Sequence, residues 1–374
     1  MPPTDLKGMD LNGPASADPQ APAAVQAPAA SPAQPEPYRR HQFHTYAALD
    51  LGTNNCRLLV ARPAREGFRI VDAFSRIVRL GEGVSASGRL GEAAIRRTLG
   101  ALEVCRDKMD VRGVTRARLI ATEACRMAEN GAEFISRVRE RTGLDLEIVD
   151  RETEAHLAAA GCAALADPAA KGVLLFDIGG GSSEIVWLAR GRHGRSDEIR
   201  SRVRHWASLK LGVVTLAEKF GGVHVTPDVF DAMVAHVAGE LAEFRARVER
   251  EMRCDSFHLL GTSGTVTTLA GVHLGLVRYD RRRVDGLWMS GDEIDDALDV
   301  LRAMSYDDRV ANGCIGSERA DLVLAGCAIL EAIRQAFPAR RVRIADRGLR
   351  EGILAELMGA DGVWRDGDKG RERR

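Results

Sequence analysis

The sequence predicts a layered α/β protein in which two related halves face one cleft. The first observation is a repeated pattern: the segment DLGTN begins at Asp50, and the segment DIGGGSSE begins at Asp177. Each segment lies between two short apolar runs, which is typical of a strand, a tight glycine turn and a second strand. The second observation is that helical and extended patterns alternate along the rest of the chain, as they do in layered α/β folds.

Hydrophobic periodicity places the individual elements. Short apolar runs bounded by glycine turns predict strands at residues 46–50, 57–61, 68–74, 75–80, 116–121, 146–149, 173–176, 185–188, 202–209, 256–260 and 342–345. Apolar spacings of three and four predict helices at residues 91–109, 133–142, 153–166, 213–220, 227–253, 292–304, 321–337 and 349–358. A third glycine turn, residues 261–265, leads into a further helix.

Composition restricts the class of protein. The chain has 374 residues, 45% of them hydrophobic, which is enough for two or three domains. Its 53 basic and 53 acidic residues balance, so the overall charge does not indicate a nucleic-acid or membrane-surface partner. The seven cysteines are scattered without a C-x-x-C pair, and no apolar run approaches about 18 residues. We therefore expect a cytoplasmic protein without a disulfide framework, a structural zinc site or a membrane span.

The two glycine turns are candidate phosphate loops. Glycine leaves the backbone N–H groups of a turn open to phosphate oxygens, and the donors would come from Gly52, Thr53 and Asn54 in one turn and from Gly179, Gly180, Gly181 and Ser182 in the other. The second hairpin would return Asp177 and Glu184 to the mouth of one loop, where two carboxylates suit Mg²⁺. The alternatives are two ordinary hairpin turns and a Glu184 on an exposed strand face.

Seven short segments together indicate a family. They occur in order at residues 48–54, 121–130, 154–155, 177–184, 261–265, 319–321 and 348–352. In residues 45–360 the chain resembles the exopolyphosphatase and guanosine pentaphosphate phosphohydrolase family, within the superfamily of actin, hexokinase and Hsp70. The resemblance implies two actin-like (ribonuclease H-like) domains of mixed sheet flanked by helices, with a catalytic interdomain cleft.

The resemblance also divides the chain. It implies an actin-like domain I at residues 45–157, completed by a C-terminal helix at 347–360, and an actin-like domain II at 158–346. Residues 1–44 read as a disordered leader, because the first 40 residues hold nine of the thirteen prolines and show no periodic hydrophobic face. Residues 361–374 read as a charged, flexible tail.

The resemblance assigns roles to further residues. Glu154, which precedes an alanine at the start of a helix, matches the general base of the family. Relatives usually carry two consecutive glutamates here, whereas this chain has Thr153-Glu154, so Glu152 is a second candidate. Arg126 matches a residue expected to clamp phosphate, and Gly261 and Ser263 are expected to shape the same cleft. Without the family, Glu154 would be read as a solvated first-turn residue. The alternative for Arg126 is a surface helix arginine, but Thr122, Arg126 and Asn130 recur at helical spacing on one face, which favours a functional role.

These assignments predict a hydrolase. We expect an exopolyphosphatase that releases terminal phosphate from polyphosphate by Mg²⁺-assisted attack of a water activated by Glu154. The same machinery would serve a guanosine pentaphosphate 5′-phosphohydrolase. The other readings are an ATPase or kinase of the superfamily, and a regulator that binds polyphosphate or guanosine tetraphosphate without turnover. A homodimer is expected by family analogy alone.

Overall fold

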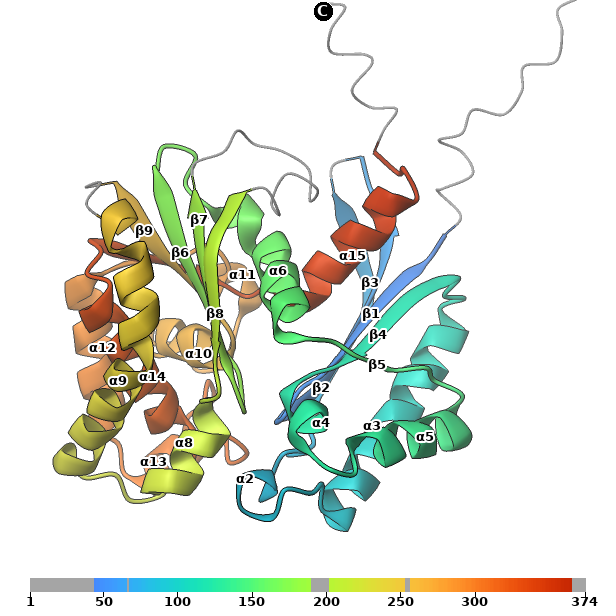
Figure 1. The fold of residues 1–374 in the computed structure, drawn as a ribbon, viewed down its shortest axis with the longest axis horizontal. Coiled ribbons are helices and arrows are strands. Elements are labelled where there is room, and N and C mark those ends of the chain that lie inside the picture. Colours follow the sequence, from blue (N-terminus) through green and yellow to red (C-terminus); the bar gives the residue numbers. More distant parts are fainter. Residues whose placement is uncertain (1–43, 66, 190–201, 253–255, 365–374) are drawn as a thin grey trace, which may run out of the picture. The chain divides into compact units, whose positions relative to one another are not determined.

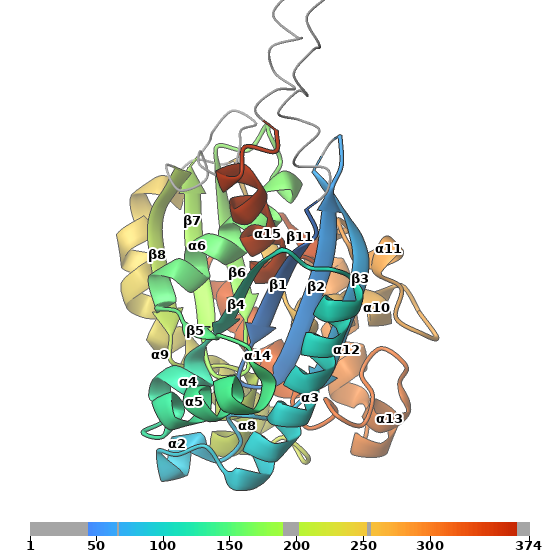
Figure 2. The same ribbon diagram turned by 90° about the vertical axis from the view of Figure 1, so that its right-hand side faces the viewer.

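Two mixed β-sheets flanked by helices form the fold (Figures 1 and 2). A computed structural model of the protein describes residues 44–65, 67–189, 202–252 and 256–364. The predicted leader up to residue 43 and the predicted tail from residue 365 lie outside the described residues. The α/β fold class with two mixed sheets is confirmed, whereas the domain boundaries stay predictions.

The first sheet has the strand order β3-β2-β1-β4-β5. Its strands are β1 (Tyr46–Leu51), β2 (Asn55–Pro63), β3 (Phe68–Ile77), β4 (Arg116–Ala121) and β5 (Glu147–Ile148). Strands β1, β2 and β3 form an antiparallel meander, and β4 runs parallel to β1. We predicted two strands at 68–74 and 75–80, but the pairing with β2 continues from Phe68 to Ile77, so one strand replaces them.

The second sheet repeats this plan with the order β10-β11-β9-β6-β7-β8. Its strands are β6 (Gly172–Ile178), β7 (Ser183–Ala189), β8 (Val203–Leu209), β9 (Phe257–Thr262), β10 (Trp288–Ser290) and β11 (Arg341–Ala345). Strands β6, β7 and β8 are the antiparallel meander, and β9 runs parallel to β6. Each predicted glycine turn therefore joins the first two strands of its own sheet.

The helices surround both sheets. They are α2 (Val84–Ser87), α3 (Glu92–Val111), α4 (Glu123–Met127), α5 (Gly131–Thr142), α6 (Arg151–Cys162), α8 (Val213–Phe220), α9 (Pro227–Met252), α10 (Gly264–His273), α11 (Arg281–Val284), α12 (Gly291–Ala303), α13 (Tyr306–Ala311), α14 (Val323–Ala336) and α15 (Leu349–Ala360), with a 3₁₀ turn at Ala163–Leu165. Figure 1 shows α3 and α5 outside the first sheet, α9, α12 and α14 outside the second, and α6 and α15 between the sheets. None of the described helices is long and apolar enough to cross a membrane.

Helices α6 and α15 join the two halves. The C-terminal helix α15 packs its apolar face on the first sheet, whereas α6 packs on the second. The two helices touch backbone to backbone: a Cβ at Gly161 would collide with the carbonyl oxygen of Gly348, and one at Gly352 with that of Leu157. This close crossing fixes the position of α6, and the first turn of α6 carries Glu154.

Candidate active site

The two glycine turns have the same geometry and touch each other. In the first turn the amide of Gly52 donates to the carbonyl of Asn55 over 2.9 Å, and in the second Gly179 donates to Ser182 over 2.9 Å. A Cβ added to Gly180 would lie 3.1 Å from Cβ of Thr53. The absence of a side chain at Gly180 therefore lets the turns of the two sheets meet.

This contact makes a prediction about Gly180. Replacing Gly180 with valine should force the two turns apart and lower kcat/KM by about 100-fold, because small displacements of substrate-holding groups are costly. The control is Gly239→Val in α9, where an added Cβ meets no atom within 4 Å. Steady-state kinetics on both folded variants measure the effect. Equal kcat/KM for Gly180→Val and wild type would show that the contact does not matter.

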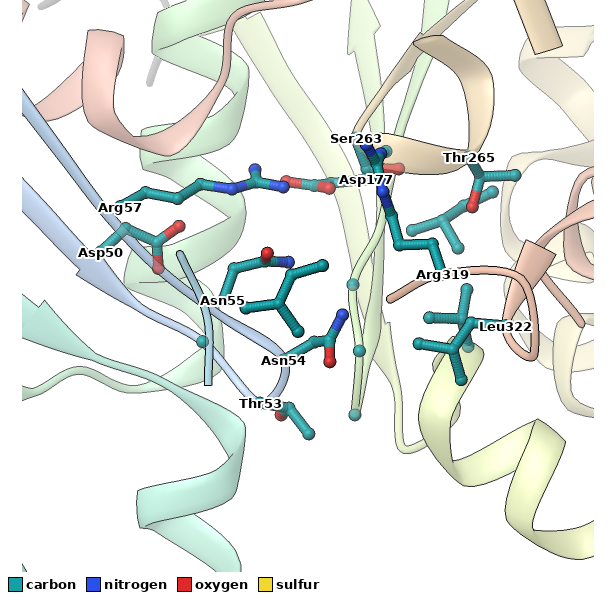
Figure 3. A pocket seen from close by; sticks show the side chains of 18 of the residues that line it. Asp50, Thr53, Asn54, Asn55, Arg57, Asp177, Ser263, Thr265, Arg319 and Leu322 are labelled. Atoms are coloured by element: carbon teal, nitrogen blue, oxygen red, sulfur yellow. The ribbon is translucent and has the colours of Figure 1, made fainter. Parts of the chain in front are cut away.

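A cavity of about 550 Å³ lies where the two turns meet. Its lining contains all the predicted site residues except Arg126 and Gly261: Gly52, Thr53, Asn54, Glu154, Asp177, Gly179, Gly180, Gly181, Ser182, Glu184 and Ser263. Figure 3 shows Thr53 and Asn54 at the end of one hairpin, with Ser263 and Arg319 across the cavity. The structure therefore brings together residues from both sheets and from α6.

Three polar side-chain atoms at this cavity are buried without a hydrogen bond among the described residues. They are Thr53 Oγ1, Asn54 Oδ1 and Ser263 Oγ. Ser263 also has a left-handed backbone, with φ of 100°, which is rare for a residue other than glycine. A buried polar atom without a partner costs about 1–3 kcal/mol. These atoms therefore favour a polar ligand that would supply the missing partners.

Two predicted phosphate-binding residues do not line the cavity. Gly261 lies inside β9, where an added Cβ would lie 2.5 Å from the ring of Phe176, so its small size serves packing. Arg126 lies in α4, and its guanidinium donates to Glu123, Glu154 and the carbonyl oxygen of Val149. The structure thus places Arg126 beside the candidate base and away from the cavity lining.

Four carboxylates line the cavity where the turns meet, those of Asp50, Glu154, Asp177 and Glu184. Asp177 and Glu184 are direct partners in the β6–β7 ladder, so their side chains lie on the same face, and Glu184 also accepts a 3.0 Å hydrogen bond from Ser208. Burial raises the pKa of Asp177 to about 6 and raises those of Asp50 and Glu184 above their usual values. The site is thus an acidic centre that favours protons or a cation.

Glu154 is held at the start of α6. The N-cap Asp150 accepts a 2.7 Å hydrogen bond from the amide of Thr153, and Glu154 is the next residue in this first turn. Burial raises the pKa of Glu154 to about 7, while the 2.7 Å contact with Arg126 acts in the opposite direction. A carboxylate with a pKa near neutrality is suited to take a proton from water. Glu152 is exposed on the same helix and does not line the cavity.

The structure adds arginines that the sequence analysis did not assign to the site. Arg57 and Arg319 line the cavity, and together with Arg350 they line an adjoining cavity of about 360 Å³. Among the described residues these three side chains have no hydrogen bond or ion pair. Burial lowers the pKa of Arg319 and that of Arg350, and the charge of Arg57 lowers both further. Three cations that make no hydrogen bond or ion pair among these residues, although Arg57 and Arg350 act on the charges of Asp50 and Asp177, favour a site for an anion with several charges.

The internal repeat could have identified Arg57. Asp50 pairs with Arg57 in the β1–β2 ladder as Asp177 pairs with Glu184 in the β6–β7 ladder, so the two residues occupy equivalent positions. One hairpin therefore presents a cation where the other presents an anion. Figure 3 shows the Arg57 side chain, which comes from the first sheet, pointing toward Asp177 of the second sheet.

An ion pair between Arg79 and Asp321 joins two segments that lie far apart in the sequence. Arg79, which has a left-handed backbone with φ of 47°, donates to both carboxylate oxygens of Asp321 over 3.0 Å. The backbone beside Arg79 bonds to the first turn, because Gly81 donates to the carbonyl of Thr53 over 2.8 Å. The ion pair therefore links the first turn to the segment that carries Arg319.

Comparisons with known proteins agree with the two-sheet fold. A model of the Ppx/GppA phosphatase family matches residues 59–360. Exopolyphosphatase 2 from Mycobacterium tuberculosis is 28% identical over 84% of this chain and 98% of its own length. A guanosine-5′-triphosphate,3′-diphosphate pyrophosphatase from Aeromonas hydrophila is 27% identical over 85% of this chain and 60% of its own. The crystal structure of the Aquifex aeolicus Ppx/GppA family member has 27% identity and a TM-score of 0.69, covering 85% of this chain and 98% of that one.

Proposed function

The chain belongs to the Ppx/GppA phosphatase family, and from this premise we propose that it is an exopolyphosphatase that releases terminal orthophosphate from inorganic polyphosphate. The family resemblance found in the sequence is confirmed, and so is the assignment as a phosphoanhydride hydrolase. The observation that carries the choice of substrate is the set of cavity arginines that make no hydrogen bond or ion pair among the described residues. Repeated phosphate charges in a linear chain would satisfy these cations.

The proposed reaction is hydrolysis by in-line attack of water on the terminal phosphorus. The water oxygen bonds to phosphorus as the bridging P–O bond breaks, and the electron pair of that bond stays on the oxygen of the shortened chain. The proton of the water passes to Glu154, which later returns it to solvent. The backbone amides of the turns, with the buried side chains of Thr53 and Asn54, would hold the phosphoryl oxygens.

The donor chemistry of the site fits Mg²⁺. Asp177 and Glu184 would hold the ion, because carboxylates are hard oxygen donors and burial, which raises the pKa of both, disfavours their charge unless a cation is bound. Within the described residues no cluster of three or more His, Cys, Asp or Glu side chains could hold a metal ion. Waters and substrate oxygens would complete the coordination, which is common for Mg²⁺. When bound, Mg²⁺ would neutralise charge on the transferring phosphoryl group.

The substrate panel tests this function. Phosphate release is measured with short polyphosphate, long polyphosphate, guanosine pentaphosphate and ATP, each with and without Mg²⁺. We expect the highest kcat/KM for polyphosphate. Guanosine pentaphosphate is the second candidate, because the Aeromonas hydrophila relative is named for that activity. Predominant turnover of ATP would indicate the ATPase or kinase reading, and tight binding without any release would indicate a regulator.

The pH dependence tests the base. With a pKa of about 7, Glu154 is ionised above that pH and protonated below it, and only the ionised form accepts a proton. We expect kcat/KM to fall about tenfold for each pH unit below roughly pH 7 and to level off above it. Initial rates at low polyphosphate concentration, from about pH 5 to about pH 9, measure this profile. A flat profile across neutrality would contradict the assignment of Glu154.

A further inference from the structure

The carboxylate of Glu123 is buried between two guanidinium groups. Its side chain is 2% exposed, and it is the first residue of α4. Its Oε2 accepts from Nε and Nη2 of Arg126, over 3.1 and 2.8 Å, and its Oε1 accepts from Nη2 of Arg151 over 2.7 Å. The site described above does not use this ion-pair network, although it lies beside the candidate base.

Arg126 carries the effect of this network to Glu154. Glu123 occupies Nε and Nη2, which together form one edge of the guanidinium, and the carbonyl oxygen of Val149 takes Nη1 over 2.6 Å. Only a further N–H of Nη2 reaches Glu154, at Oε2 over 2.7 Å. Among the described residues no hydrogen bond reaches Oε1 of Glu154. The base thus keeps one oxygen available beside the cavity that its side chain lines.

We propose that Glu123 is a positioning residue that holds Arg126 to a single contact with Glu154 and thereby leaves Oε1 of Glu154 to accept the proton of the attacking water. The inference rests on the proposed function. An arginine edge can donate two parallel hydrogen bonds to one carboxylate. Without the anion of Glu123, that edge of Arg126 is available to both oxygens of Glu154, and a carboxylate held in this way is a weaker base.

Glu123 also supports the second phosphate turn. A Cβ added to Gly181 would lie 3.3 Å from Cγ of Glu123, so the stem of Glu123 packs directly against this turn. One side chain therefore sets both the position of the turn and the orientation of Arg126. The buried negative charge is costly by itself and is compensated by Arg126 and Arg151.

The test is Glu123→Gln in the full chain. We expect kcat for polyphosphate to fall at least about tenfold, a part of the contribution of a general base, while KM stays within about twofold. The low-pH limb of the rate profile should move to lower pH, because Arg126 then stabilises the ionised form of Glu154 more strongly. The other charged groups that act on Glu154 are unchanged in this variant: Asp50 on β1, Asp177 on β6 and Glu184 on β7.

Two further variants keep the test decisive. Asp72→Asn is the matched control, because Asp72 is also a mostly buried carboxylate between two cations, Lys108 and Arg112, and does not line either cavity. It should lower the melting temperature and leave kcat unchanged. Glu123→Asp, which keeps the anion but withdraws it from Arg126 by one methylene, replaces Glu123→Gln if that variant does not fold, and should lower kcat with KM unchanged.

The outcomes separate the inference from the proposed function. A folded Glu123→Gln with wild-type kcat and KM overturns the positioning role. A raised KM with unchanged kcat also overturns it, because that result would place the network in substrate binding. Failure of the wild-type protein to release phosphate from any substrate instead overturns the proposed function. A lower kcat in the Glu123 variant with an unmoved pH limb would also overturn the role, because the effect would then not act through the base.

Discussion

Replacing Glu154 with glutamine is expected to lower kcat for phosphate release by about 10²- to 10⁴-fold, the usual contribution of a general base. The amide has nearly the shape of the carboxylate but cannot take a proton from water. Arg126 would still donate to the amide oxygen, so the fold and the cavity should persist. Single-turnover phosphate release measures the chemical step, and titration with a non-hydrolysable polyphosphate analogue should show unchanged affinity.

The matched control for this prediction is Glu152→Gln. Glu152 lies on the same helix, is exposed, and does not line the cavity, so its replacement should leave kcat within about twofold of wild type. This pair of variants also decides between the two glutamates that the sequence offers as the base. If Glu152→Gln were the inactive variant and Glu154→Gln retained full activity, the assignment of the base would be wrong.

Local patterns in the sequence predicted the features that contiguous residues determine. The glycine turns at Gly52 and Gly179 were predicted because each lies between two short apolar runs within one contiguous segment. The facing of Asp177 and Glu184 was predicted because the two residues end the same hairpin, and their ladder pairing agrees with it. The meeting of the turns themselves was expected only in outline, because it depends on the crossing of α6 and α15, whose sequences lie far apart.

Features that depend on partners from other elements were not predicted. The sequence gives no means to decide which carboxylate Arg126 meets, because Glu123 and Glu154 lie on different helices and compete for one guanidinium. Gly261 resembles a loop glycine by its neighbours, yet its small size makes room for the ring of Phe176. Arg57 was missed although it pairs with Asp50 as Glu184 pairs with Asp177. An arginine stands in one hairpin where the other has a glutamate, so the repeat was not recognised at this position.

Removal of divalent cations is expected to lower kcat/KM by at least about 100-fold, because the carboxylates and the phosphates would then repel each other without a counterion. Activity is measured after treatment with a chelator and after return of Mg²⁺. A second readout does not depend on turnover: Mg²⁺ should raise the melting temperature, and Asp177→Asn should reduce this rise. Full activity in excess chelator would contradict the proposed role of Asp177 and Glu184.

The raised pKa values of the carboxylates determine how the stabilisation by Mg²⁺ should change with pH. Burial raises the pKa of Asp177 from 3.8 to about 6 and that of Glu154 to about 7. Groups whose pKa is raised by folding stabilise the protein while they are protonated, below about pH 4, and this contribution is lost as the pH rises through 6 and 7. For Asp177 alone the loss is roughly 3 kcal/mol.

Protons compete with Mg²⁺ for the same oxygens, so the rise in melting temperature on adding Mg²⁺ should be larger at about pH 8 than at about pH 5. An equal rise at both pH values would place the ion away from these carboxylates.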